Sequence, residues 1–362
     1  MGLSVMRRFL LAASVCCFAS LLSLQSAQAS GVPADFFGVM ADGPTFDGQT
    51  DMASEFRLMY RSGARSVRFA VYWPSIEPSR GAFDVEQLDA RFAAAQAAGL
   101  NVLPVVAGTP GWAASAPVTS ASPPADSADY ANIVARLARR YGPGGTFWKG
   151  RSGKPLPVKA WQIWNEPDLS KFWALDHGPW AVGYVRLLRA ARKSIKAVDP
   201  KAKIVLAGMT NASWRSLRSI YLAGGRGQFD LAAIHPFSKE VAGVLQIVRL
   251  ARRAMAAGKD SKTPLLLTEI SWTSALGRAR LVYGWESTEA GQASKLREAL
   301  TQLAARRRPD NLAGLYWATW LSPKVGSDFS FDYSGLRKMS GGIPVSKPAL
   351  AAYRQTVAKL TR

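Results

Sequence analysis

The chain has 362 residues, of which 48% are hydrophobic, and a formal net charge of +21. This length is sufficient for one large domain or two ordinary ones. Both cysteines, Cys16 and Cys17, lie among the first thirty residues, which excludes disulfides and thiolate metal sites from the rest of the chain.

The first 29 residues have the pattern of a secretory signal peptide. Arg7 and Arg8 precede an apolar stretch over residues 9–24, and Ala27-Gln28-Ala29 forms a small-residue cleavage site. The apolar stretch is shorter than the ~20 residues that span a bilayer, so we do not expect a stable membrane anchor. We predict cleavage after Ala29, a secreted or periplasmic protein, and one domain over residues 30–362.

Short apolar runs alternate with longer amphipathic ones through the remainder of the chain. Helical spacing of apolar residues predicts helices near 51–62, 84–99, 127–142, 180–197, 213–223, 239–257, 288–307 and 348–360. Strands are predicted at 35–41, 66–73, 101–108, 158–164, 202–209, 229–235, 264–270 and 312–320. Eight such units predict an α/β fold, a single (β/α)8 TIM barrel. An open doubly wound sheet is the alternative, but the phosphate-binding loop that normally follows its first strand is absent from the sequence.

In such a barrel the active site lies at the carboxyl ends of the strands. Two carboxylates stand there, Glu166 and Glu269, on strands three apart around the ring, so both can point into one pocket. Paired carboxylates beneath aromatic rings suit cleavage of a glycosidic bond, because one must give a proton while the other stays ionised. Taken singly, each glutamate could be a helix cap or a salt-bridge partner. The other candidates at strand ends are Arg68, Trp73, Trp112, Asn165, His235, Trp272 and Trp317, although an arginine there could simply neutralise a buried acid and the tryptophans could be core.

Other catalytic chemistries have weak support. The chain has only two histidines, His177 and His235, so a His-rich zinc site cannot be assembled. The G-x-S-x-G motif of serine hydrolases is absent. We therefore expect no metal and no cofactor.

Several segments resemble successive barrel strands of clan A glycoside hydrolases, closest to family 39 and to family 5-like bacterial endoglycosidases. These segments are SVRFAVYWPSIEP, GLNVLPVVAGTPGWA, WQIWNEPD, FDLAAIHPF and PLLLTEISW. The resemblance implies that Glu166 is the general acid/base and Glu269 the nucleophile of a retaining mechanism. It further implies that Asn165 binds the sugar 2-hydroxyl, Arg68 keeps the nucleophile ionised, His235 lines the floor and Trp317 is the sugar platform. Asp168 and the sequence HPF depart from the common pattern and put the identity of the sugar in doubt.

The sequence thus predicts a retaining glycoside hydrolase acting on an oligo- or polysaccharide, such as an exopolysaccharide. A non-catalytic glycan-binding barrel is the alternative from another class, and a transglycosylase is the alternative with the same site. The basic charge is spread over helical segments and indicates either solvated helix faces or an anionic partner, such as an acidic polysaccharide or an envelope surface. Without a recognisable nucleic-acid module, we expect no nucleic-acid binding, and we expect a monomer.

Overall fold

The computed structural model describes residues 31–174, 178–322 and 326–362. The predicted signal peptide, residues 1–29, lies outside this range. Within the described part of the chain, no helix has the length and apolar character needed to cross a membrane.

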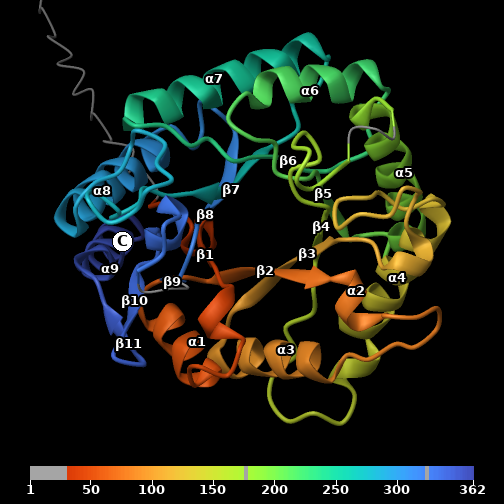
Figure 1. The fold of residues 1–362 in the computed structure, drawn as a ribbon, viewed down its shortest axis with the longest axis horizontal. Helices are drawn as coiled ribbons and strands as arrows, with labels where there is room; N and C mark the ends of the chain where they lie inside the picture. Colours follow the sequence, from red (N-terminus) through yellow and green to blue (C-terminus); the bar gives the residue numbers. More distant parts are fainter. Residues whose placement is uncertain (1–30, 175–177, 323–325) are drawn as a thin grey trace, which may run out of the picture. The chain divides into compact units, whose positions relative to one another are not determined.

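Eight parallel strands form the barrel, which confirms the predicted fold (Figure 1). Their hydrogen-bonded order is β5-β4-β3-β2-β1-β8-β7-β6, and isolated parallel bridges from Val205 to Leu231 and from Met209 to Ile234 bring the β5 and β6 edges together. The strands are β1 (Phe37–Met40), β2 (Ser66–Tyr72), β3 (Asn101–Ala107), β4 (Ala160–Ile163), β5 (Lys203–Val205), β6 (Ala232–Ile234), β7 (Leu265–Ile270) and β8 (Leu312–Trp317).

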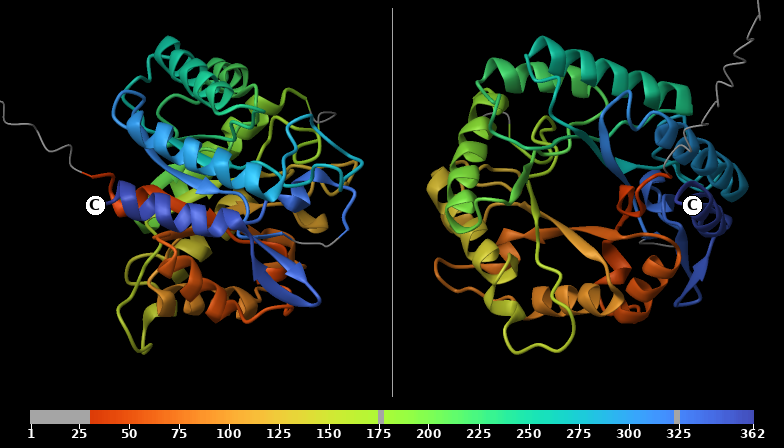
Figure 2. Two further views of the ribbon diagram at one scale, coloured as in Figure 1. Left: turned by 90° about the vertical axis from the view of Figure 1, so that its left-hand side faces the viewer. Right: turned by 180° about the vertical axis from the view of Figure 1, so that it is seen from behind.

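Helices surround the strands, as the end-on and side views show (Figure 2). They are α1 (Met52–Arg61), α2 (Trp73–Ile76), α3 (Glu86–Ala98), α4 (Ser127–Tyr141), α5 (Trp180–Val198), α6 (Ser213–Leu222), α7 (Val241–Ala257), α8 (Glu289–Ala305) and α9 (Pro348–Leu360). Short 3-10 helices are η1 (Ala34–Phe36), η2 (Gly43–Thr45), η3 (Gly111–Ala113), η4 (Thr146–Trp148) and η6 (Ser330–Tyr333).

Helix α4 illustrates how the sequence fixes an element in place. The Asp126 side chain accepts a hydrogen bond from the Ala128 N–H and caps the helix. Along the buried face, Tyr130 reaches the strand layer, where its hydroxyl donates to the Val106 carbonyl at 2.7 Å. This bond fixes the position of α4 along β3 and holds the carboxyl end of that strand.

A small second sheet lies beside the end of β8. It consists of β9 (Leu321–Ser322), β10 (Arg337–Ser340) and β11 (Ile343–Ser346). A buried ion pair between Arg337 and Glu55 joins β10 to α1, and the Trp320 indole N–H donates to the same carboxylate at 2.7 Å. These buried contacts fix the segment that follows β8 against the barrel.

Candidate active site

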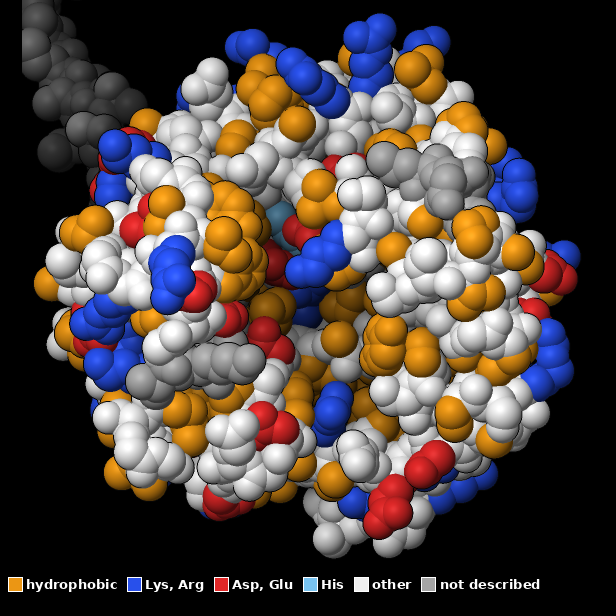
Figure 3. Space-filling view, in the orientation of Figure 1, with side chains coloured by type: hydrophobic (Ala, Val, Ile, Leu, Met, Phe, Trp, Pro, Cys, Tyr) orange, Lys and Arg blue, Asp and Glu red, His pale blue; other side chains and the backbone are white. Residues whose placement is uncertain are grey.

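Both predicted glutamates lie at the carboxyl ends of their strands. Glu269 belongs to β7, and Glu166 lies in the turn just after β4. Trp164 and Glu166 have positive φ angles of 71° and 44°, in the left-handed region that non-glycine residues rarely occupy. Such backbone conformations cluster at functional sites, where the surrounding structure holds them. The space-filling view shows a hollow at this end, with acidic, basic and histidine side chains at its floor (Figure 3).

His235 lies between the two carboxylates. Its Nδ1 is 2.7 Å from Glu166 Oε1, and its Nε2 is 3.7 Å from Glu269 Oε1. The nearest donor atoms of Glu166, His235 and Glu269 all lie within 4.8 Å of one another. The Thr268 hydroxyl lies 3.0 Å from Nε2 and fixes the plane of the imidazole ring. The structure thus brings the predicted acid, nucleophile and floor residue into one cluster.

Arg68 connects the nucleophile candidate to the rest of the motif. Its guanidinium donates to Glu269 at 2.9 Å, to the Asn165 side-chain oxygen at 2.7 Å and to Gln162 at 2.8 Å. Because Arg68 is almost fully buried, these charge-assisted bonds hold all three partners in fixed positions. Gln162 was missed by sequence reasoning, although its polar side chain inside the apolar strand KAWQIW was a usable signal.

The surroundings shift the pKa values of the two glutamates in opposite directions. Burial raises the pKa of Glu166, and the negative charge of Glu269 adds to this, so that together they outweigh the contact with His235. Burial also acts to raise the pKa of Glu269, but His235 and the Arg68 guanidinium outweigh it, so the pKa of this carboxyl is lowered. Near neutral pH, Glu166 is therefore the better proton donor and Glu269 the better anion.

A cavity of about 270 Å³ lies over the nucleophile side of this cluster, lined by Asp42, Arg68, Tyr72, Asn165, Phe172 and Glu269 among others. Asp42 is a third carboxylate in the cavity, and it accepts a hydrogen bond from the Thr319 hydroxyl. Burial raises its pKa to about 6. Asp42 lies two residues after the end of β1, so inspection of that strand end would have identified it from the sequence.

The predicted tryptophans lie deeper than expected. Trp73, Trp272 and Trp317 are almost fully buried. Their indole N–H groups donate to the Glu77 carboxylate, the Lys239 carbonyl and the Ser334 carbonyl, respectively. The position of Trp317 does not fit the exposed sugar platform predicted for it, because no indole face is accessible. We instead assign it to the wall that supports the site.

Trp112 is only partly buried. Its indole N–H donates to the Glu77 carbonyl at 3.0 Å, and the Arg80 guanidinium covers the ring at 4.4 Å from the ring centroid. Its edge packs on Trp73, so these two rings support the loop after β3.

A different group of rings lies beside the acid/base, and sequence reasoning missed it. We call it the aromatic cluster: Phe237, Tyr283, Trp285, Phe329 and Phe331. The ring centroid of Phe237 lies 6.4 Å from that of His235. Phe237 also packs on Trp285 and Phe331, with centroid distances of 5.6 and 5.0 Å. Tyr283 is 54% exposed, and the Trp285 indole nitrogen has no hydrogen-bond partner among the described residues. The cluster thus connects to Glu166 through Phe237 and His235, and Tyr283 gives it accessible aromatic surface.

Glu286 fixes the loop that carries Tyr283 and Trp285. Its carboxylate accepts hydrogen bonds from the Tyr283 and Gly284 N–H groups at 2.7 and 2.9 Å, and from the Ser330 hydroxyl at 2.8 Å. Because the last bond reaches η6, the two loops of the cluster are joined. The rings are therefore held in position before any ligand binds.

A metal is a weaker interpretation of the central cluster. Glu166, His235 and Glu269 bring three donor atoms close enough to ligate an ion. However, both imidazole nitrogens face hydrogen-bond partners, Glu166 and Thr268, and Arg68 already donates to Glu269. A cation at this position would have to displace these contacts and would lie close to the guanidinium charge. The donor chemistry therefore favours an acid/base site.

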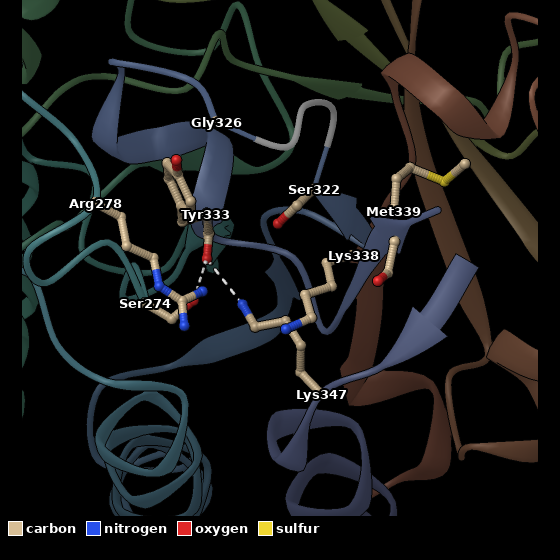
Figure 4. A pocket seen from close by; sticks show the side chains of 9 residues that line it. Ser274, Arg278, Ser322, Gly326, Tyr333, Lys338, Met339 and Lys347 are labelled. Atoms are coloured by element: carbon tan, nitrogen blue, oxygen red, sulfur yellow. Dashed lines mark hydrogen bonds between the residues drawn. The ribbon is translucent and has the colours of Figure 1, made fainter. Parts of the chain in front are cut away.

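A separate cavity of about 420 Å³ lies beside η6 and β10 (Figure 4). Lys347 lines it, and its ammonium donates to the carbonyls of Tyr333 and Gly335 at 2.9 and 2.8 Å. Arg278 and Lys338, also in its lining, both pair with the Glu289 carboxylate, at 3.4 and 2.7 Å. Since its cations are bonded to groups of the protein, we interpret this cavity as part of the framework behind the aromatic cluster.

Comparisons with known proteins agree with this geometry. Residues 46–144 match a family model described as Glyco_hydro_42, beta-galactosidase. No curated protein matches the chain. The resemblance to clan A glycoside hydrolases is confirmed.

Solved structures extend the likeness over most of the chain. A family 39 glycoside hydrolase from the gut symbiont Bacteroides cellulosilyticus WH2 is 18% identical with a TM-score of 0.69, over 91% of this chain and 64% of its own. A monomeric beta-xylosidase from Caulobacter crescentus CB15 is 17% identical with a TM-score of 0.67, over 90% and 68%. The GH53 catalytic domain of Ignisphaera aggregans is 20% identical with a TM-score of 0.62, over 90% and 97%.

The chain spans less than two thirds of the length of the first of these proteins. At these identities the structural likeness establishes the fold. The family match over residues 46–144 agrees with the prediction of a glycosidase.

Proposed function

We propose that this protein is a retaining glycoside hydrolase that cleaves O-glycosidic bonds of an oligo- or polysaccharide. The observation that carries the proposal is the pair of carboxylates with oppositely shifted pKa values and oxygens within 4.8 Å of each other. Retaining enzymes have carboxyl groups about 5–5.5 Å apart, whereas inverting enzymes need about 6.5–9.5 Å to admit a water.

In the first step, an ionised Glu269 oxygen attacks the anomeric carbon while Glu166 donates its proton to the departing glycosidic oxygen. The bond to the leaving group breaks and a covalent glycosyl ester with Glu269 forms. In the second step, Glu166 removes a proton from water, which attacks the anomeric carbon and frees Glu269.

The neighbouring groups assist both steps. Arg68 neutralises Glu269 and holds it ready for attack. When Glu166 loses its proton, a hydrogen bond from His235 Nδ1 stabilises the carboxylate that remains. Asn165 has its side-chain oxygen held by Arg68, which leaves its amide N–H groups to donate to a substrate hydroxyl beside the nucleophile.

The other functions predicted by the sequence have less support. A binding protein without catalytic activity needs neither a proton donor nor an arginine-paired carboxylate. This site has Glu166 in the first role and Glu269 in the second. A transglycosylase would share the first step and differ only in the acceptor that enters the second. We retain hydrolysis because water needs no dedicated acceptor site.

For the cellular context, we propose a secreted or periplasmic protein that acts as a monomer on a polysaccharide. An acidic glycan is favoured by the net charge, which is +21 for the full chain and, without Arg7 and Arg8, 21 − 2 = +19 for the cleaved one. The sequence of residues 1–29 supports export. The amino-terminal sequence of the secreted protein is the direct test, and we expect it to begin at Ser30.

The stereochemistry of the first product tests the mechanism. The protein is incubated with a panel of aryl glycosides and purified polysaccharides, and the anomeric proton of the earliest product is followed by NMR. We expect the configuration of the substrate to be kept. A product of inverted configuration would show the roles of Glu166 and Glu269 to be wrong.

A further inference from the structure

A groove between α6 and α7 lies on the helical wall of the barrel. Its volume is about 680 Å³, larger than the 270 Å³ cavity over Glu269. Lys and Arg side chains gather along the edge of the molecule formed by these two helices, with hydrophobic side chains between them (Figure 3). None of the residues proposed for catalysis lines this groove.

Four cations border the groove: Arg218, Arg226, Arg253 and Lys259. All four are exposed, and within the described ranges none of them forms an ion pair with a carboxylate. Asp260 is next to Lys259 in sequence, but its carboxylate accepts hydrogen bonds from the hydroxyls of Tyr221 and Thr263. Among the described residues no carboxylate lies within ion-pair distance of these four cations, whereas two cations of the other cavity share Glu289. The four positive charges of the groove exceed the single negative charge of the nearby Asp260, so the groove is positive.

The floor of the groove is apolar and partly aromatic. Trp214, Tyr221, Leu250 and Ala254 contribute to it. Gly258 allows the tyrosine ring to lie against the end of α7, since a Cβ there would come within 2.5 Å of Tyr221 Cδ2. The bond from the Tyr221 hydroxyl to Asp260, 2.9 Å long, fixes the orientation of the ring. Flat apolar surface between cations matches a sugar chain, whose C–H faces pack on rings while its anionic groups bind arginine.

We propose that the α6–α7 groove is a second glycan-binding site, for an anionic polysaccharide, separate from the catalytic cavity. The role of this second site, to hold substrate for the enzyme, rests on the proposed hydrolase function. Binding of a polysaccharide to the groove does not, because it requires no catalysis. A polymer held there stays near the catalytic cavity between cleavage events, which raises its local concentration.

An anionic membrane is the competing partner for a basic and apolar surface. Peripheral binding to a bilayer requires apolar side chains that protrude into the lipid. Here Leu222 is the exposed large apolar residue among those that line the groove, while Trp214 and Tyr221 are partly buried at its floor. A concave surface with recessed rings favours a chain that lies in the groove over a lipid surface.

Binding is best measured by isothermal titration calorimetry in a Glu269→Gln background, so that no substrate is consumed. The probes are a polyuronate, an uncharged dextran, and vesicles of phosphatidylglycerol. The test variant changes Arg218, Arg226, Arg253 and Lys259 to Gln. The matched control removes the same charge from exposed residues outside the groove, by changing Arg61, Lys154, Arg354 and Lys359 to Gln.

We expect the groove variant to bind polyuronate at least ~10-fold more weakly and the control variant to change by less than ~3-fold, because charges beyond a Debye length are screened. Trp214→Ala, which leaves the charge unchanged, should also weaken binding to polyuronate. Equal losses in the groove and control variants would overturn the proposal, as would vesicle binding that depends on the groove in the absence of polyuronate binding.

Turnover of a small aryl glycoside separates this proposal from the catalytic one. With Glu269 intact, the groove variant should hydrolyse such a substrate as fast as the wild type, since the groove residues lie outside the catalytic cavity. If the wild type binds polyuronate through the groove but hydrolyses no glycoside, the proposed function fails and the groove assignment stands.

Discussion

The Nδ1 atom of His235 lies 2.7 Å from Oε1 of Glu166, and the side of the ring that faces Gly208 leaves no room for a methyl group. The imidazole of His235 thus contacts Glu166, the proposed proton donor, through Nδ1 and the Thr268 hydroxyl through Nε2. The position of Glu166 therefore depends on three other strands as well as on its own turn. His235 follows β6, Thr268 belongs to β7 and Gly208 follows β5.

Replacement of the two glutamates by alanine should have different consequences. Glu269→Ala should lose nearly all activity on every substrate, because the anomeric carbon is not attacked. Glu166→Ala should still react with a dinitrophenyl glycoside, whose leaving group needs no proton, and should then stall at the glycosyl-enzyme. Stopped-flow measurement should show a burst followed by slow turnover, with azide restoring the second step. A Glu166→Ala variant whose loss of rate is the same for good and poor leaving groups would contradict the role of acid/base.

The pH dependence of kcat/KM should be bell-shaped. Activity rises with pH as Glu269, whose pKa is lowered, becomes ionised, and it falls as Glu166, whose pKa is raised, loses its proton. Arg68→Gln should move the acidic limb to higher pH, because the guanidinium stabilises ionised Glu269. Arg80→Gln removes an exposed arginine paired with Asp129 and should leave both limbs in place. An unmoved acidic limb in Arg68→Gln would disprove this account of the nucleophile.

Gly208→Ala should impair catalysis by displacing His235. A Cβ at this position would lie 1.9 Å from His235 Nε2, so the imidazole must move away from Glu166 or Thr268. We expect kcat/KM to fall at least ~10-fold, about 1.4 kcal/mol of transition-state stabilisation. Gly111→Ala is the matched control, since a Cβ there meets open space. Kinetics on folded protein, checked by circular dichroism, should separate the two variants. Equal activities would mean that the ring position is unimportant.

Trp317→Ala should act mainly on stability. The side chain is fully buried and its indole N–H donates to the Ser334 carbonyl at 3.0 Å. Loss of a buried tryptophan costs roughly 3–5 kcal/mol in unfolding free energy, so the urea midpoint should decrease clearly. Activity per folded molecule should fall less than stability does. A strong loss of kcat/KM without any change in the unfolding midpoint would restore the role of sugar platform.

Tyr283→Ala should weaken binding of an extended substrate, because the exposed ring belongs to the aromatic cluster that packs on His235. An oligosaccharide that extends over the cluster should lose roughly 5-fold or more in kcat/KM, given about 1 kcal/mol for an aromatic contact. A simple aryl glycoside should be affected less. Leu276→Ala, another exposed position of the same loop, serves as the control. Identical effects of Tyr283→Ala on both substrates would exclude the cluster from substrate binding.

The sequence by itself determined the barrel and the centre of its site. Alternating apolar and amphipathic segments specify eight strand–helix units. A strand buried on both faces is a short apolar run, whereas a helix buried on one face has apolar residues at helical spacing. Parallel strands then place their carboxyl ends together, and this rule groups Arg68, Asn165, Glu166, His235 and Glu269 from the sequence alone. The Gln162 contact with Arg68 and the carboxylate of Asp42 were accessible to the same reasoning.

Only the tertiary structure decided which aromatic rings are accessible. Trp317 at a strand end and Tyr283 in a loop both carry a large aromatic ring, and no local pattern predicts which ring is exposed. Trp317 is buried with its indole N–H bonded to Ser334, whereas Tyr283 is exposed on a loop held by Glu286. The α6–α7 groove likewise depends on helix packing, which places Arg218 and Arg253 from separate helices on one surface and leaves both without a carboxylate partner among the described residues. Exposure and charge compensation are set by contacts between segments far apart in the chain, and periodicity along the chain does not encode them.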